Sequence, residues 1–369
     1  MGRILIPQLI RPCAIVRHRL LRGIAQAKAC GSAALQNRAR SFRIRSPQSA
    51  VRLILTAIVG LGLSCSEESR RTISIGTGGT GGVYYPYGGG LAEIWSKHVP
   101  GLKAVAEVTG ASVENVRLAH KGETVIGEIM GDVAYQAYHG QGQFEGKPQK
   151  ILGLAVMYPN VLQVVSHEGS GVASIGQLNG ETVSIGAPGS GTAYMSNLVL
   201  EALGISRESL NVRRLSFVEN ANALRDHSIA VGVWCVAPPT STIMDLATTH
   251  GIKIIPLTPR EQKKVTDRYS FYSAYDLPAG VYRGVDKVVP TLSVWNVIIC
   301  QADLPKDLVY DLTRVLFEHN DYMQKIHPFA RYTTPQNTVR HSPIPLHPGC
   351  VQYLTERGLA VPDNPAPKG

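Results

Sequence analysis

The stretch TISIGTGGTGGVYY, residues 72–85, joins a short β-branched run to a glycine turn and then to a segment with helical spacing. The stretch ETVSIGAPGSGTA, residues 181–193, repeats this arrangement later in the chain. The first turn of a helix has free backbone N–H groups and about +0.5 charge, and glycine lets a ligand approach the backbone. Two such turns predict two α/β lobes that bind one small anion between them.

The basic excess of the chain lies in its N-terminal segment. The whole chain has 369 residues and a net charge of +10, from 37 Lys and Arg against 27 Asp and Glu. Residues 1–64 hold 11 of those bases and none of the acids, so residues 65–369 have 26 bases, 27 acids and a net charge of −1. A nearly neutral body gives no reason to expect nucleic-acid binding.

Residues 1–64 are typical of a targeting segment. Several arginines precede the apolar run Leu53–Leu63, and Ser64 and Cys65 follow it. A basic region, an apolar run and a small residue form a secretory signal, and this run is shorter than the ~20 residues that span a bilayer. We therefore expect a periplasmic or extracytoplasmic protein with Cys65 as the candidate lipidation site.

The acid-free stretch before that run is longer than a signal needs. One hypothesis is that translation begins downstream of Met1, near Val51. The competing interpretation is an organelle transit peptide.

The cysteines and acidic residues give no catalytic or metal-binding pattern. Beyond the targeting segment and Cys65, Cys235, Cys300 and Cys350 are far apart and follow no CxxC or Cys/His spacing. Cys235 and Cys300 lie in hydrophobic runs, which predicts buried thiols without an essential disulfide. We find no paired carboxylates at helical spacing and no defensible Ser/His/Asp arrangement, so we expect no enzyme, no metal and no cofactor.

From residue 71 onward, strands and helices alternate, which predicts parallel sheets covered by helices. We expect separate strands at residues 151–157 and 161–166, a single long helix at 306–327, and a loop-like segment with short helix at 259–286. The order fits two lobes with two chain crossings. Residues 72–159 plus 287–369 form the first predicted lobe and residues 160–286 form the second.

The predicted binding residues lie at the two turns and at strand ends that should face the cleft. They are Gly78, Gly79, Thr80, Gly82, Val83 and Tyr84 in the first turn; Ser190, Gly191, Thr192 and Ala193 in the second; and Gln136, Tyr138 and Trp234 at strand ends. Ser190 is expected to donate a hydroxyl hydrogen bond beside free N–H groups. An alternative for each turn is a simple tight βα connection, and for the tyrosines simple core packing.

A dinucleotide site is the main alternative function. Residues Gly76–Gly81 satisfy G-x-G-x-x-G, and Glu107 lies near the end of the second strand, where a Rossmann site needs an acid. This pattern allows an NAD(P)-dependent oxidoreductase. Predicted export and the bulky aromatics after Val83 count against it. Neither a P-loop lysine nor G-x-S-x-G is present at the turns.

The sequence IGTGGTGGVYYP, residues 75–86, resembles the opening of the TAXI proteins, the solute-binding subunits of one branch of TRAP transporters. Further matching stretches are GASVEN (110–115), GAPGSGT (186–192), LEALG (200–204), VYDLT (309–313) and IPLHPG (344–349). Together they cover most of residues 72–360. The resemblance implies a type II periplasmic-binding-protein fold, with two α/β lobes joined by two crossover segments around a ligand cleft.

The same resemblance implies a function in transport. It implies capture of a small carboxylate, such as glutamate, glutamine or a 2-oxo or dicarboxylic acid, by a receptor expected to be monomeric. An integral-membrane TRAP permease would receive the solute. One departure concerns Ala230, which stands where the family usually has a second Asp. No arginine clamp lies near either turn, so backbone amides and hydroxyls are expected to hold the carboxylate.

Overall fold

Ten strands form one sheet in this computed structural model, which describes residues 71–363 and residue 365. The sheet order is β2-β1-β3-β10-β4-β7-β5-β6, with β8 paired to β4 and β9 paired to β10. The strands are β1 (Arg71–Gly76), β2 (Leu102–Glu107), β3 (Ile126–Met130), β4 (Ile151–His167), β5 (Thr182–Ser184), β6 (Asn211–Arg213), β7 (Val231–Val236), β8 (Ile252–Ile254), β9 (Ser273–Leu277) and β10 (Val289–Gln301).

Helices follow most of these strands, as the alternating pattern predicts. The α-helices are α3 (Tyr84–His98), α4 (Ser112–Lys121), α5 (Gly131–His139), α6 (Gly191–Leu203), α7 (Phe217–Arg225), α8 (Ser241–Thr249), α9 (Pro259–Arg268), α10 (Lys306–Glu318), α11 (Asn320–Ile326), α12 (Pro335–His341) and α13 (Pro348–Glu356). Short 3₁₀ turns are η1 (Gly142–Phe144), η2 (Glu168–Ser170), η3 (Ile175–Gln177), η4 (Arg207–Ser209) and η5 (Pro328–Tyr332). The predicted α/β fold class is confirmed.

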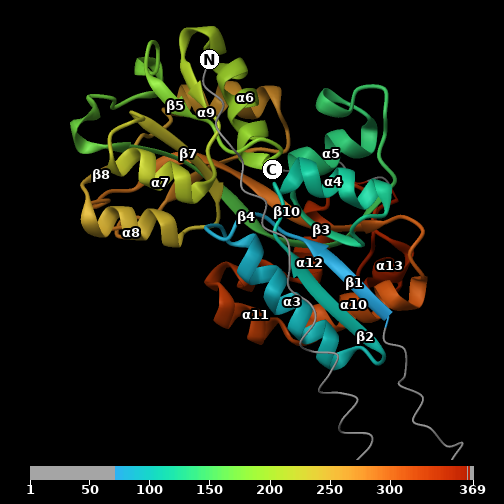
Figure 1. The fold of residues 1–369 in the computed structure, drawn as a ribbon. Helices are drawn as coiled ribbons and strands as arrows, with labels where there is room; N and C mark the ends of the chain where they lie inside the picture. Colours follow the sequence, from blue (N-terminus) through green and yellow to red (C-terminus); the bar gives the residue numbers. More distant parts are fainter. Residues whose placement is uncertain (1–70, 364, 366–369) are drawn as a thin grey trace, which may run out of the picture. The chain divides into compact units, whose positions relative to one another are not determined.

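Two parallel triplets of strands have the same order. β1 lies between β2 and β3, and β5 lies between β6 and β7. Each triplet then pairs with a long antiparallel strand, β10 beside β3 and β4 beside β7. Figure 1 shows the triplets on either side of these two long strands. The central strand of each triplet is a topological switch point, and the crevice outside its carboxyl end is where α/β sheets bind ligands.

The long strand β4 corrects one sequence prediction. The strands expected at 151–157 and 161–166 are one continuous strand, because Pro159 does not break it. Pro159 pairs with Trp295 of β10 directly beside a register shift between Trp295 and Val297. Proline lacks an N–H and is tolerated in a sheet at such an irregularity. β4 and β10 therefore carry the chain between the two triplets.

One helical prediction was wrong and another was incomplete. The helix expected at 306–327 ends at Glu318 and restarts at Asn320, where Asn320 and Asp321 disfavour a helix interior. The segment at 259–286, expected to be loop-like with short helix, contains the short helix α9 and also the strand β9, which the sequence did not predict. Thr258 caps α9 in a capping box with Glu261, a signal that the sequence interpretation missed.

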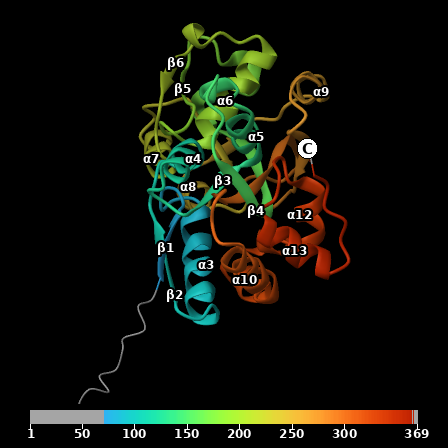
Figure 2. The same ribbon diagram turned by 90° about the vertical axis from the view of Figure 1, so that its right-hand side faces the viewer.

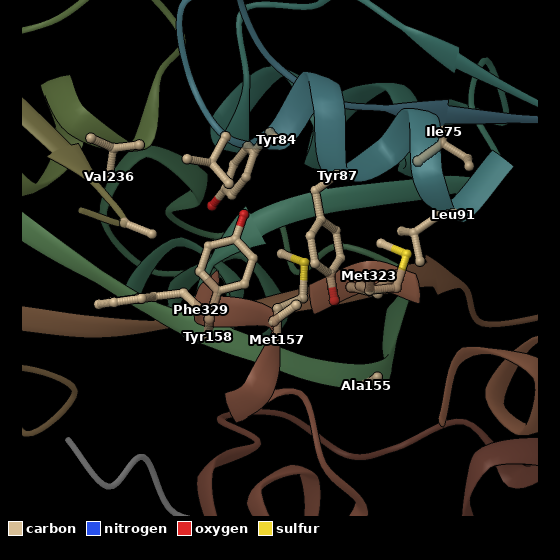
Figure 3. Packing of buried hydrophobic residues seen from close by; sticks show 14 of the residues in the cluster. Ile75, Tyr84, Tyr87, Leu91, Ala155, Met157, Tyr158, Val236, Met323 and Phe329 are labelled. Atoms are coloured by element: carbon tan, nitrogen blue, oxygen red, sulfur yellow. The ribbon is translucent and has the colours of Figure 1, made fainter. Parts of the chain in front are cut away.

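Hydrophobic side chains pack on both faces of the sheet. Trp234 and Val236 belong to one buried cluster and Val233 and Cys235 to the other, because neighbouring residues of a strand point to opposite faces. Figure 3 shows part of the first cluster, with Tyr84 and Tyr87 of α3 packed against Tyr158 of β4. The predicted burial of the Cys235 and Cys300 thiols is confirmed.

The C-terminal helices pack against the first part of the chain. α10 and α11 contact α3, and Figure 2 shows α10 beside α3. The lobe boundaries stay a prediction, because both hydrophobic clusters include residues from both predicted lobes. The targeting segment 1–64 and Cys65 lie outside the described residues. Within residues 71–363, no helix has the length and hydropathy needed to cross a membrane.

Glu128 of β3 is a carboxyl group enclosed in this core. Its side chain is fully buried, and neither carboxyl oxygen has a hydrogen-bond partner among the described residues. Burial raises the pKa of Glu128 well above its usual range, because the charged form would lose its hydration. The native protein therefore holds Glu128 protonated.

Glu128→Gln should stabilise the protein increasingly as pH rises. An unfolded Glu ionises at about pH 4.3, whereas native Glu128 keeps its proton to higher pH. The wild type therefore loses stability as the pH rises above about 4.3, until native Glu128 also ionises. The gap in unfolding free energy between variant and wild type should grow by up to about 1.4 kcal/mol per pH unit. Denaturant melts from about pH 5 to about pH 8 measure it, with the exposed Glu145→Gln as control. Parallel profiles for Glu128→Gln and wild type would contradict a buried neutral carboxyl.

Candidate functional site

The first glycine turn joins β1 to α3 and is anchored by its neighbours. Thr77 donates from its backbone N–H and from Oγ1 to the carbonyl of Glu107, at 3.0 and 2.7 Å. Asn115 Nδ2 donates to the carbonyls of Gly76 and Thr77, at 3.0 and 2.7 Å. These bonds hold the carbonyls of the turn's first residues and so fix the turn at the end of β1.

Several N–H groups of this turn are left without acceptors. Only Gly82 donates within the turn, to the carbonyl of Gly79 at 3.2 Å. The backbone N–H groups of residues 78–81 and of the helix start at Val83 and Tyr84 have no acceptor in the described part of the chain. They provide a set of donors at the positive end of α3.

The second glycine turn joins β5 to α6 and has a left-handed backbone at two glycines. Gly186 has φ 104° and Gly189 has φ 78°, values that favour glycine. Ser190 caps α6: its Oγ accepts from Ala193 N–H at 3.1 Å and donates to the Ala187 carbonyl at 2.7 Å. The helix start leaves the N–H groups of Gly191 and Thr192 without an acceptor among the described residues.

This capping corrects the expected role of Ser190. Its hydroxyl hydrogen is already donated to Ala187, so it has no hydrogen left for a ligand. Ala193 likewise uses its N–H for the cap and does not line the cavity. The donors that the second turn offers are backbone groups rather than the serine hydroxyl.

The second turn contacts the start of α4, in the first predicted lobe. The carbonyl of Gly189 accepts from the N–H groups of Val113 and Glu114, at 3.0 and 3.3 Å. A Cβ placed on Gly191 would lie 2.6 Å from Ser112 Oγ and would overlap Met130 Sδ. Glycine at 191 is therefore needed for this close approach.

A third helix start, which the sequence interpretation missed, faces the same space. Ser216 caps α7, and its N–H donates to the Glu219 carboxylate at 2.8 Å in a capping box. The N–H groups of Phe217 and Val218 remain without acceptors in residues 71–363. The pattern Ser216-x-x-Glu219 is a recognisable helix-start signal and could have located this element.

These helix starts all line one cavity of about 430 Å³. It is lined by Gly78–Tyr84 of the first turn, by Ser190–Thr192 of the second, by Val108–Ser112 before and at the start of α4, and by Leu215–Glu219 at α7. Met130, Asn160, Cys235 and Val236 line it from strands of the sheet. Its size suits a small-molecule ligand.

The electrostatics of the cavity come from the backbone. Among residues 71–363, no Lys or Arg lines the cavity, and Glu219 is the one charged side chain that does. Hydrogen bonds from Ser216 lower the pKa of the Glu219 carboxyl, so it remains ionised in its cap. An anionic group placed here would be stabilised by N–H groups and helix dipoles alone.

Tyr84 forms part of the wall and is held in place from behind. Its hydroxyl donates to Asn296 Oδ1 at 2.5 Å, and Asn296 Nδ2 donates to the Tyr158 carbonyl at 2.7 Å. Burial raises the pKa of Tyr84 well above its usual range, so the hydroxyl stays protonated. Tyr84 therefore positions the wall and has no free proton for a ligand.

Three predicted binding residues lie away from the cavity. Gln136 and Tyr138 were expected at a strand end, but β3 ends at Met130 and both belong to α5, where Gln136 accepts from the Tyr194 hydroxyl. Trp234 lies inside β7, fully buried, and its Nε1 donates to Thr242 Oγ1 at 3.2 Å. None of the three belongs to the cavity lining.

Residues 75–358 match the family model of the NMT1-like family, and the chain belongs to that family. The structure is also similar to several solved proteins. A putative L-cystine ABC transporter from Listeria monocytogenes has 14% identity and TM-score 0.45, covering 72% of this chain and 98% of that one. The periplasmic aliphatic sulphonate binding protein SsuA from Escherichia coli has 11% identity and TM-score 0.42, covering 78% and 79%. The ligand-binding component of an ABC-type import system from Staphylococcus aureus has 12% identity and TM-score 0.45, covering 80% and 94%.

Gly191→Ala should separate the second turn from α4, whereas Gly79→Ala should be tolerated. The added methyl at 191 meets Met130 and Ser112, but at 79 it meets nothing within 4 Å. We expect Gly191→Ala to cost about 1–3 kcal/mol of stability and Gly79→Ala less than about 1 kcal/mol. Chemical denaturation measures both, and equal effects would contradict the close contact at Gly191.

Proposed function

We propose that this chain is an extracytoplasmic solute receptor that binds a small carboxylate in the cavity between the two glycine turns. The observation that carries the proposal is that helix starts far apart in the sequence place unpaired N–H groups on one cavity. A charge-assisted hydrogen bond contributes roughly 1.5–3 kcal/mol, so a few such bonds offset the costs of binding a small anion.

The motifs that resemble TAXI proteins support the proposal by their location. Residues 78–84 of the first motif, Gly110–Ser112 of the second and most of residues 187–192 of the third line this cavity. We therefore propose a TAXI-type receptor that passes its solute to the membrane permease of a TRAP transporter. The predicted binding residues that remain in this proposal are Gly78, Gly79, Thr80, Gly82, Val83, Tyr84, Gly191 and Thr192, with Ser190 as a structural cap.

Binding should be coupled to closure of the two predicted lobes. The cavity takes its lining from residues 78–130 of the first lobe and from residues 160–236, which the sequence assigned to the second. A ligand that contacts both sides favours the closed arrangement, and the membrane partner would recognise that arrangement. An oxidoreductase that binds NAD(P) through Gly76–Gly81 stays the alternative, and saturable NADH binding would favour it.

Val218→Asp should weaken carboxylate binding far more than Val218→Asn. Val218 is 45% exposed and lines the cavity, so either substitution should be accepted by the fold. Its side chain lies beside the first turn, where a methyl on Gly81 would overlap it. The Asp carboxylate would compete for the same N–H groups and repel an anion, whereas the Asn side chain has nearly the same shape without charge. We expect at least about a tenfold difference in Kd between the variants.

Calorimetric titration with glutamate, glutamine, 2-oxoglutarate and succinate measures this difference. A wild type that binds none of these small carboxylates would reject the proposed ligand class. Equal affinity of the Asp and Asn variants for a carboxylate that does bind would reject the proposed location of its charge.

A further inference from the structure

Strand β4 carries a buried amide whose hydrogen-bonding groups are unused. Asn160 is 3% exposed and lines the cavity, yet its Oδ1 has no partner and its Nδ2 donates to no group in residues 71–363. Buried polar groups in native proteins are nearly always paired, and an unpaired one destabilises the fold. The amide is therefore positioned for a partner that comes with the ligand.

Gln163, three positions along the same strand, shows what a structural amide looks like here. It is fully buried, its Nε2 donates to the Val236 carbonyl at 3.0 Å, and its Oε1 accepts from the Tyr282 hydroxyl at 2.6 Å. Both ends of this amide are used by the fold. The contrast with Asn160 indicates that the unused amide is not a general property of β4.

The strand residues that line the cavity together with Asn160 disfavour a second charge on the ligand. The other strand residues of the lining are Met130, Cys235 and Val236, and burial raises the pKa of the Cys235 thiol, which stays neutral. The lining has no Lys or Arg, so a carboxylate beside Asn160 would be buried without a cationic partner. An uncharged polar group would meet a complementary amide at no such cost.

We propose that Asn160 binds an uncharged polar group of the ligand, above all a primary carboxamide, and makes the receptor prefer ω-amides of monocarboxylates to dicarboxylates. This inference rests on the proposed function, which assigns the ligand's single carboxylate to the helix starts. A ligand amide pairs with Asn160 twice. Its N–H donates to Oδ1, and the Nδ2–H of Asn160 donates to its carbonyl.

Two series of three probes each, in which the members differ only at one end, test this preference. They are pentanoate, glutaramate and glutarate, together with butanoate, succinamate and succinate, each titrated calorimetrically into wild type and Asn160→Leu. At the chain length that binds, wild type should bind the ω-amide at least about tenfold more tightly than the dicarboxylate. Asn160→Leu should lose at least about tenfold in affinity for the ω-amide and less than about threefold for the unsubstituted acid.

The stability of the ligand-free protein separates a binding role from a structural one. Asn160→Leu removes an unpaired amide at similar volume, so its melting temperature should equal or exceed that of wild type. Gln163→Met, the matched control, should melt lower because it removes the side-chain donor to the Val236 carbonyl and the acceptor for the Tyr282 hydroxyl hydrogen. A lowered melting temperature for Asn160→Leu, like that of the control, would assign Asn160 to the fold.

The outcomes distinguish the inference from the proposed function. Dicarboxylates that bind as tightly as ω-amides, or unchanged amide affinity in Asn160→Leu, would overturn the role of Asn160 while carboxylate binding itself stands. Failure of all six probes to bind would overturn the amide preference, and the carboxylate receptor is rejected as well when glutamate, glutamine and 2-oxoglutarate also fail to bind.

Discussion

The binding cavity depends on backbone N–H groups that the fold leaves without acceptors. A helix start cannot satisfy its first N–H groups internally, and α3, α6 and α7 all begin at one cavity. The lining contains no basic side chain, so these dipoles supply the positive potential. Glycine at 191 lets the second turn approach the start of α4, and the amide of Asn115 holds the first turn at the end of β1.

The strand order explains why the turns meet. β1 and β5 are the central strands of two parallel triplets, and each glycine turn leaves the carboxyl end of its central strand. β4 and β10 join the triplets into one sheet, and β4 contributes Asn160 to the cavity.

Local sequence patterns were sufficient to predict the two glycine turns. They were insufficient to place the residues and strands around those turns. The helix starts at Tyr84 and Gly191 follow from glycine beside β-branched runs, and both turns do line one cavity. Gln136 and Trp234 were misplaced because a short apolar run does not reveal where a strand ends or which face a side chain takes. The continuity of β4 through Pro159 depends on its pairing with Trp295, a contact between distant residues that no local pattern contains.

The central claim is that both glycine turns hold the same anionic group, and amide NMR of the protein tests it most directly. A small carboxylate that binds should shift the backbone amide signals of residues 78–84 and of Gly191 and Thr192 together, with the same saturation curve. Saturable binding that shifts the amide signals of only one turn, or of neither, would contradict a shared anion site.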